Sequence, residues 1–223
     1  MSPPLTIESS GEDAGAPYDS RAAAFDRMVR SRLYNGLAWG TSPAAYEAFA
    51  AEAVADGSGP LLEAAAGSAA ASAEAHARSG RPTVVSDLSR GMLERAGERI
   101  AVAAPGEDEL GSRIRLVQAD ALDLPFPPGG FATVLTLGSL HLFEDVAALR
   151  DALLAQLEPG GRLYATGLVT ATRRGGAYLR ALNRAGEVAA PRTAGELRDA
   201  LEPETFRLDG CMAFAVVRAP APA

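Results

Sequence analysis

The sequence contains no lysine, and every one of its 21 basic residues is an arginine. This absence excludes several kinds of chemistry that depend on a lysine side chain. A pyridoxal phosphate Schiff base, a Walker-type phosphate loop and the Tyr-x-x-x-Lys pair of short-chain dehydrogenases each require one. The function must therefore rest on other side chains or on the backbone.

Cysteine and histidine are almost as scarce, with one cysteine, Cys211, and two histidines, His76 and His141. These numbers exclude a disulfide framework and a thiolate zinc site within one chain, and we expect no metal site. Cys211 lies in an apolar run and is expected to be a small core residue. His76 follows the first glycine-containing turn and is expected on the surface of a helix.

Acidic residues outnumber basic ones, 28 to 21, and give the chain a formal net charge of −7. No overall field would attract nucleic acid or an anionic membrane. The start of the chain lacks a positive region followed by an apolar core, and no stretch approaches 18 uncharged apolar residues. We expect a cytoplasmic protein that acts on a small molecule, as a monomer or a homodimer.

The chain has a length typical of one domain with small appendages. Residues 1–17 are expected to be a disordered tail because they are rich in small and polar residues. Residues 18–58 show apolar residues at three- and four-residue steps, which is typical of helices. Thr41 or Ser42 is expected to cap the second of these helices, with Pro43 in its first turn.

From residue 59 to residue 219, short apolar runs alternate with longer helical ones. This pattern predicts an α/β fold with a mostly parallel sheet covered on both faces. The final runs, around Asp209 and Gly210, predict an antiparallel hairpin at the C-terminal end.

The stretch "GPLLEAAAGSAAASAEAHARSG" (59–80) has two interpretations that exclude each other. By propensity it is one alanine-rich helix. By its place in an alternating chain it is a strand that ends at Glu63, a tight turn through Gly67 and a helix that starts at Ser68. We favour the second interpretation, because the sheet has no other candidate for its first strand.

The chemistry expected at such a turn comes from backbone N–H groups that approach a ligand closely. Asp87 ends the next predicted strand, 20 residues after Gly67, where a carboxylate can accept hydrogen bonds from both ribose hydroxyls. Together the turn and the acid suggest a cofactor that contains a nucleoside.

Four motifs in order resemble those of class I S-adenosylmethionine-dependent methyltransferases, particularly the small-molecule group typified by ubiquinone and menaquinone biosynthesis. The motifs are "LLEAAAGSA", "VVSDLSRGMLERA", "LVQADALDLPFPPGGFATVL" and "ALLAQLEPGGRLYATG". The resemblance covers roughly residues 61–168. It implies a Rossmann-like, seven-stranded sheet with a C-terminal antiparallel hairpin, N-terminal helices as a lid over residues 18–58, and S-adenosylmethionine as cofactor.

The resemblance also implies a role for each matching residue. Glu63 and Gly67, with Ala65 and Ala69 in the same turn, would hold the methionine end of the cofactor. Asp87 would bind the ribose, and Leu137 and Gly138 would border the sulfonium. The residues implied at the adenine are Leu88, Met92, Asp120 and Ala121. His141 stands where relatives often have a histidine facing the substrate, as a candidate general base.

Other candidates lie outside these motifs. Tyr18 is a candidate cofactor-binding residue of the lid, and Tyr34, Trp39 and His141 are candidate substrate-binding residues. Aromatic lid residues would suit an apolar or aromatic acceptor. A group of arginines forms either an anion site or a solvated helix face: Arg173, Arg174, Arg180, Arg184 and Arg192.

The turn departs from the family pattern, because alanines occupy positions 65 and 69 where the family has glycines. If residue 65 needs a positive φ, alanine costs roughly 1–2 kcal/mol there. The departure leaves open a non-methylating cyclase of natural-product biosynthesis or a binding protein with the same fold. A nicotinamide-dependent oxidoreductase is disfavoured, because Gly-x-Gly-x-x-Gly and the Tyr/Lys pair are both missing.

Overall fold

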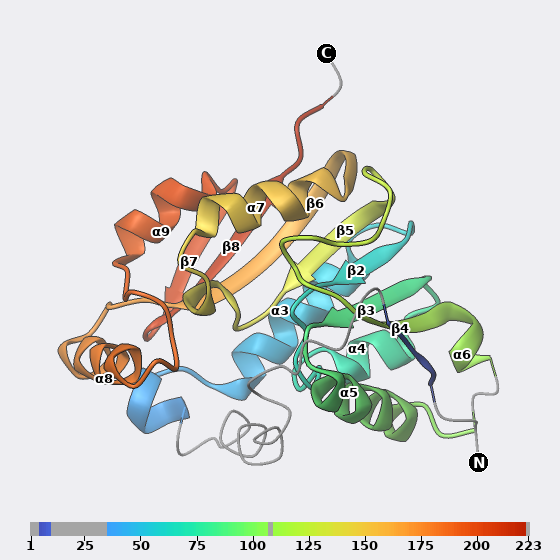
Figure 1. The fold of residues 1–223 in the computed structure, drawn as a ribbon, viewed down its shortest axis with the longest axis horizontal. Helices are drawn as coiled ribbons and strands as arrows, with labels where there is room; N and C mark the ends of the chain where they lie inside the picture. The colour runs from blue at the N-terminus through green and yellow to red at the C-terminus, as the bar shows by residue number, and fades with distance from the viewer. Residues whose placement is uncertain (1–4, 10–34, 107–108, 222–223) are drawn as a thin grey trace.

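The structure, a computed structural model, describes residues 5–9, 35–106 and 109–221. Its central feature is an eight-stranded sheet with the strand order β1-β4-β3-β2-β5-β6-β8-β7 (Figure 1). The strands are β1 (Ile7–Ser9), β2 (Leu61–Glu63), β3 (Thr83–Asp87), β4 (Ile114–Gln118), β5 (Phe131–Thr136), β6 (Leu157–Leu168), β7 (Thr205–Asp209) and β8 (Met212–Arg218).

All pairings from β1 to β6 are parallel, whereas β8 pairs antiparallel with both β6 and β7. The predicted Rossmann-like α/β sheet with a C-terminal antiparallel hairpin is thus confirmed. The strand number differs from the expected seven because β1, inside the predicted disordered tail, adds an edge strand. Only three residues make up β1, too few for a recognisable alternation of apolar side chains.

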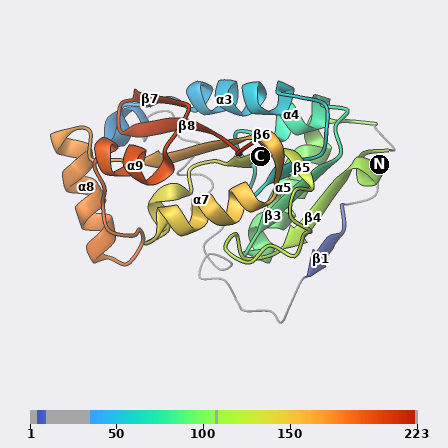
Figure 2. The ribbon, with the colours of Figure 1, turned by 90° about the horizontal axis from the view of Figure 1, so that it is seen from above.

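Helices cover both faces of the sheet. They are the π-helix η1 (Asn35–Trp39), α3 (Pro43–Ala55), α4 (Ala73–Arg78), α5 (Arg90–Ala103), α6 (Leu110–Arg113), the 3₁₀ helix η2 (Leu140–Leu142), α7 (Val146–Ala155), α8 (Arg173–Arg184) and α9 (Ala194–Leu201). Figure 2 shows α3 and α4 along one face of the sheet and α7 along the opposite face. In the part of the chain that the structure describes, no helix is long and apolar enough to cross a membrane.

The period of two along the strands divides the core between the two faces. Leu163 of β6 and Ala213 of β8 pack in one cluster with Leu149 of α7. Their neighbours Tyr164 and Phe214 belong to the opposite cluster.

The helix α3 belongs to this core, although the sequence analysis places it in a lid. Phe49 and Ala53 of α3 are buried against Leu61 of β2 and Phe214 of β8. Ser42 caps α3 by accepting a hydrogen bond from the Ala45 N–H, with Pro43 in the first turn, as expected. Residues 18–34, the rest of the predicted lid, lie outside the described residues.

Candidate cofactor site

The stretch 59–80 is a strand, a turn and a helix rather than one helix. The strand β2 ends at Glu63, as expected, and the helix α4 begins at Ala73, five residues later than predicted. Ala65, Gly67 and Ala69 have φ values of +50°, +55° and +50°. Because a right-handed helix cannot include a residue with positive φ, α4 must start after Ala69.

Ala65 and Ala69 thus adopt the left-handed conformation that glycine provides at little cost. Each alanine pays roughly 1–2 kcal/mol for this conformation, which the surrounding contacts must offset. Three backbone N–H groups anchor the turn to the neighbouring strand ends: Ala64 to the Leu135 oxygen at 2.8 Å, Ala66 to the Ser86 oxygen at 3.0 Å and Gly67 to Asp87 Oδ2 at 2.7 Å.

Asp87, the last residue of β3, connects this turn with the start of α5. Its Oδ2 accepts from the Gly67 N–H at 2.7 Å, and its Oδ1 accepts from the Ser89 N–H at 2.8 Å. A carboxylate oxygen has two lone pairs and can accept more than one hydrogen bond, which makes a carboxylate at this position a suitable partner for ribose hydroxyls. Asp87 therefore has a structural role in addition to its candidate binding role.

Glu63 at the end of β2 is buried and forms a hydrogen bond with His76, a residue that the sequence analysis misjudged. His76 Nε2 lies 2.5 Å from Glu63 Oε2, and the two side chains are 0% and 1% exposed. The expectation of a surface His76 is wrong, because α4 presents this position to the inside of the molecule. A six-residue helix is too short for a clear apolar period to reveal which side faces inward.

The candidate adenine residues lie beyond β3 and β4. Leu88 is 44% exposed, which leaves its side chain open to a ligand, whereas Met92 of α5 is buried. Asp120 is exposed, and its Oδ1 accepts from the Leu122 N–H at 2.9 Å. Ala121 is buried beside it. These residues follow the carboxyl ends of neighbouring parallel strands, where α/β sheets bind ligands.

Leu137 and Gly138 follow β5, next to the β2 turn in the sheet order. Gly138 has a φ of +66°, and its N–H donates to Thr166 Oγ1 at 2.6 Å. A side chain at Gly138 would lie 3.9 Å from Cε1 of Tyr46. Tyr46 of α3 therefore borders the site, a residue that sequence reasoning counted only as part of an apolar helix face.

His141 of η2 is held by two backbone contacts. Its Nδ1 accepts from the Leu168 N–H at 3.3 Å, and its carbonyl oxygen accepts from the Ala189 N–H at 3.0 Å. Burial lowers the pKa of His141 to about 4, so the ring is neutral at pH 7. A neutral ring whose Nδ1 accepts a hydrogen bond carries its proton on Nε2 and is a donor at that atom.

The predicted lid aromatics are only partly described. Trp39 is buried, and its ring stacks on Tyr178 of α8 with a centroid distance of 5.0 Å. The indole therefore packs η1 against α8. Tyr18 and Tyr34 lie outside the described residues.

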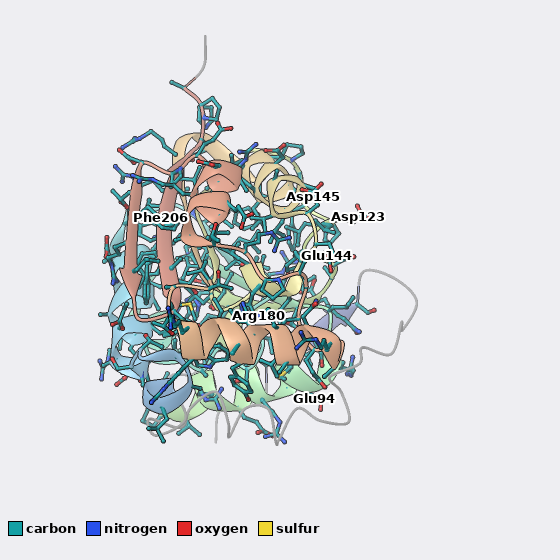
Figure 3. The ribbon with its side chains drawn as sticks, turned by 90° about the vertical axis from the view of Figure 1, so that its left-hand side faces the viewer. Glu94, Asp123, Glu144, Asp145, Arg180 and Phe206 are labelled. Atoms are coloured by element: carbon teal, nitrogen blue, oxygen red, sulfur yellow. The ribbon has the colours of Figure 1, made fainter. Side chains whose placement is uncertain are left out.

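The five candidate arginines do not form one group. Arg192 donates to the carbonyl oxygens of Phe143 and Glu144 and so fixes the loop after η2. The other four are exposed on α8, which crosses the lower part of Figure 3 with Arg180 labelled on it. Within the described ranges no group of three or more His, Cys, Asp or Glu residues is placed to hold a metal ion.

Comparisons with known proteins agree with this geometry. Residues 61–161 match the family described as methyltransferase domain. The demethylmenaquinone methyltransferase of Clavibacter sepedonicus is 40% identical over 120 residues, 52% of this chain and 45% of that protein. The demethylmenaquinone methyltransferase of Thermus thermophilus is 38% identical over 64 residues, 29% of each chain. The matched region thus spans less than half the length of these curated relatives.

Residues 61–161 of this chain thus resemble a methyltransferase domain.

Solved structures share the fold of this chain at low sequence identity. The [4+2]-cyclase SpnF covers 100% of both chains, with a TM-score of 0.72 and 15% identity. The geranyl diphosphate C-methyltransferase from Streptomyces coelicolor A3(2) covers 94% of this chain and 99% of its own, with a TM-score of 0.66 and 16% identity. One methylating and one cyclising protein therefore have the same fold.

The matched region of the methyltransferase domain includes the turn, Asp87, Asp120 and His141, and it excludes Tyr46 and α8. Tyr46 makes a T-shaped contact with Phe214, and burial, reinforced by the charge of Asp209, raises its pKa. Its hydroxyl thus stays protonated at neutral pH. A glycine with positive φ after β5 was the available signal for this part of the site, but no sequence pattern pairs that glycine with a tyrosine 92 residues before it.

Proposed function

We propose that this chain is an S-adenosylmethionine-dependent methyltransferase that acts on a small molecule. The observation that carries the proposal is the hydrogen bond from the Gly67 N–H to Asp87, which unites a left-handed turn with an acid at the end of the next strand. This arrangement suits a nucleoside cofactor whose two ends lie over β2 and β3.

The residues present fit that cofactor. The Glu63 carboxylate supplies an acceptor for the ammonium group, Asp87 supplies a carboxylate for the ribose hydroxyls, and exposed Leu88 offers an apolar face to the adenine. Bound S-adenosylmethionine supplies an electrophilic methyl group. The remaining task of the protein is to align the acceptor with that methyl group and to exclude water.

His141 acts in this proposal as a hydrogen-bond donor to the acceptor rather than as a general base. In the neutral ring, Nδ1 is occupied by the Leu168 N–H and Nε2 bears the proton. A donor at this place suits an acceptor oxygen that is a carbonyl, phenolate or enolate, because it stabilises negative charge on that oxygen. We propose a small apolar or aromatic acceptor of this type, and a cytoplasmic protein that acts as a monomer or homodimer.

A non-methylating enzyme or a binding protein is the second candidate. The left-handed alanines at positions 65 and 69 favour it, because their methyl groups and backbone strain work against tight cofactor binding. The fold is compatible with this candidate, since a cyclase shares it over its whole length.

Calorimetric titration with S-adenosylmethionine, S-adenosylhomocysteine and NAD tests the proposal. We expect both sulfur compounds to bind and NAD to show no heat of binding. Binding of neither sulfur compound would refute the proposal. Tight binding of the cofactor without methyl transfer to quinols, phenols or enols would favour the second candidate.

The variant Asp87→Asn refines this test. We expect it to weaken binding of S-adenosylhomocysteine by about 2 kcal/mol, because the ribose hydroxyls lose a charged acceptor. It should also lower the free energy of unfolding by about 1 kcal/mol, because the asparagine has a single acceptor oxygen and one of the two backbone N–H groups loses its acceptor. Asp199→Asn on the exposed face of α9 is the matched control and should change neither quantity. Unchanged affinity in a folded Asp87→Asn protein would remove the ribose assignment.

A further inference from the structure

The hydrogen bond between Glu63 and His76 joins the two ends of the cofactor turn. Glu63 is the last residue of β2, and His76 lies in α4, 13 residues later. Between them lie the two left-handed alanines. The contact between Nε2 and Oε2, at 2.5 Å, therefore closes the segment that departs from the usual glycine pattern.

Stability alone does not account for this pair. A buried carboxylate and imidazole lose their hydration, and a well-packed apolar pair in the same space is often as stable or more stable. Among the described residues, no hydrogen-bond partner is placed for buried His76 Nδ1. The same holds for two more buried atoms, Ser72 Oγ at the end of the turn and Ser86 Oγ in the neighbouring strand β3. Polar groups retained at such a cost are typical of functional sites.

The pair leaves one half of the carboxylate unused. His76 Nε2 donates to Glu63 Oε2, and Glu63 Oε1 has no hydrogen-bond partner among the described residues. With its χ angles fixed by the imidazole, the carboxylate offers Oε1 in one orientation. A cofactor ammonium group would then meet a preorganised acceptor instead of a mobile one.

We infer that His76 is a positioning residue that holds Glu63 for the ammonium group of the cofactor and keeps the alanine-containing turn closed. The inference rests on the proposed function, because it requires a cofactor with a methionine part. In this inference His76 affects only the binding of the amino-acid end of the cofactor, not of its nucleoside end. Ligands that lack the amino acid are therefore predicted to be insensitive to His76.

The experiment compares S-adenosylhomocysteine with 5′-methylthioadenosine, which contains the same nucleoside but no amino acid. The variant His76→Met replaces the imidazole by an apolar side chain of similar size and removes the donor. We expect it to weaken S-adenosylhomocysteine binding about tenfold or more. Binding of 5′-methylthioadenosine should be unchanged. His76→Gln restores a donor near the Nε2 position and should recover most of the lost affinity for S-adenosylhomocysteine.

The possible outcomes separate the inference from the proposed function. Wild-type protein that binds neither ligand refutes the proposed function. Wild-type binding with an unchanged affinity of His76→Met for S-adenosylhomocysteine overturns the inference alone. Equal losses for both ligands also overturn it, because they indicate a general collapse of the turn.

A measurement on the wild-type protein covers the case in which the variants do not fold. The proton between His76 Nε2 and Glu63 is expected to give a resolved downfield NMR signal, because both side chains are buried and the proton is protected from exchange with water. S-adenosylhomocysteine should shift this signal and 5′-methylthioadenosine should not. The inference fails if the signal responds to both ligands alike or to neither.

Discussion

The backbone conformations of Ala65 and Ala69 determine the strain in the cofactor turn. Both residues have a φ of +50°, so Ala65→Gly and Ala69→Gly remove a strain of roughly 1–2 kcal/mol each. Glycine also makes the unfolded chain more flexible, at a cost of about 0.4–1 kcal/mol per site. We expect the double variant to be more stable than wild type by about 1 kcal/mol, and to bind S-adenosylmethionine at least as tightly.

Thermal melting and calorimetry check this expectation, with Ala44→Gly in α3 as the matched control. Ala44 is exposed and helical, so glycine there should lower stability by about 1 kcal/mol. A double variant that loses stability as the control does would show that the alanines are not strained in solution.

The imidazole of His141 gives the protein a dependence on pH with a predictable sign. Its pKa falls from 6.5 to about 4 on folding because burial disfavours the charged ring. Between these values the unfolded chain binds more protons than the folded chain, so the contribution of His141 is complete above pH 6.5 and is lost as the pH falls toward 4. Urea unfolding at pH 7, 6 and 5 should show a steeper loss for wild type than for His141→Gln. Parallel curves for the two proteins would contradict the burial of the ring.

Individual residues of the candidate site differ in how far the sequence reveals their positions. The place of Asp87 beside the turn could be predicted because its spacing from Gly67 is fixed by the length of one turn and one helix. The places of His76 and Tyr46 could not, because they depend on which side of a helix faces inward. Both meet partners far along the chain: Tyr46 lies beside Gly138, and His76 pairs with Glu63 across the turn.

The helix α3 is fastened to the sheet by one buried guanidinium. Arg81 is 6% exposed and donates to the carbonyl oxygens of Gly59, Val54 and Asp56, each within 2.9 Å, and to Thr133 Oγ1 at 2.9 Å. It thereby satisfies carbonyl groups at the C-terminal end of α3 that have no partner within the helix. The start of β5 is tied to the same place.

Replacing Arg81 by Met should therefore lower the free energy of unfolding by about 3 kcal/mol or more, because several buried carbonyl groups lose their donor at once. Arg78→Met is the matched control: Arg78 is exposed and, among the described residues, pairs with Glu74 on the same helix, so we expect a loss of about 0.5 kcal/mol or less. Chemical denaturation of both variants measures the difference. Similar losses would show that the Arg81 contacts carry little net energy.

Elements with a strong period were predictable, and short or irregular ones were not. The alternation of strands and helices and the hairpin at Asp209 and Gly210 follow from composition and pattern. The start of α4 was misplaced because alanine favours a helix locally, whereas the contacts of the turn impose positive φ at Ala69. Here the tertiary structure overrides a local preference of about 1 kcal/mol.

The edge strand β1 protects one side of the whole sheet. Ile7, Glu8 and Ser9 pair with the outer edge of β4, and Glu8 Oε2 lies 2.6 Å from Nη2 of Arg115. Deleting residues 1–9 leaves β4 as an open edge with unpaired backbone groups, which promotes association between molecules. We expect a loss of about 1–2 kcal/mol in stability and concentration-dependent self-association.

Size-exclusion chromatography with light scattering, together with urea unfolding, measures both effects. Glu8→Gln in the full chain is the control, because it removes only an exposed ion pair and should change stability by less than about 1 kcal/mol. A shortened protein that behaves like this control would show that β1 does not protect the edge.

The position of β8 has a consequence for the order in which the protein is made. Although β8 is the last strand in the sequence, it lies inside the sheet between β6 and β7. The Cys211 N–H just before it donates to the Trp39 carbonyl oxygen at 2.7 Å. The ribosome therefore makes β8 after both of its neighbours in the sheet, and the segment before α3 waits for its partner through more than 170 residues of synthesis. Until β8 has been made, the apolar flank of β6 is uncovered, and during that interval the nascent chain most needs a chaperone.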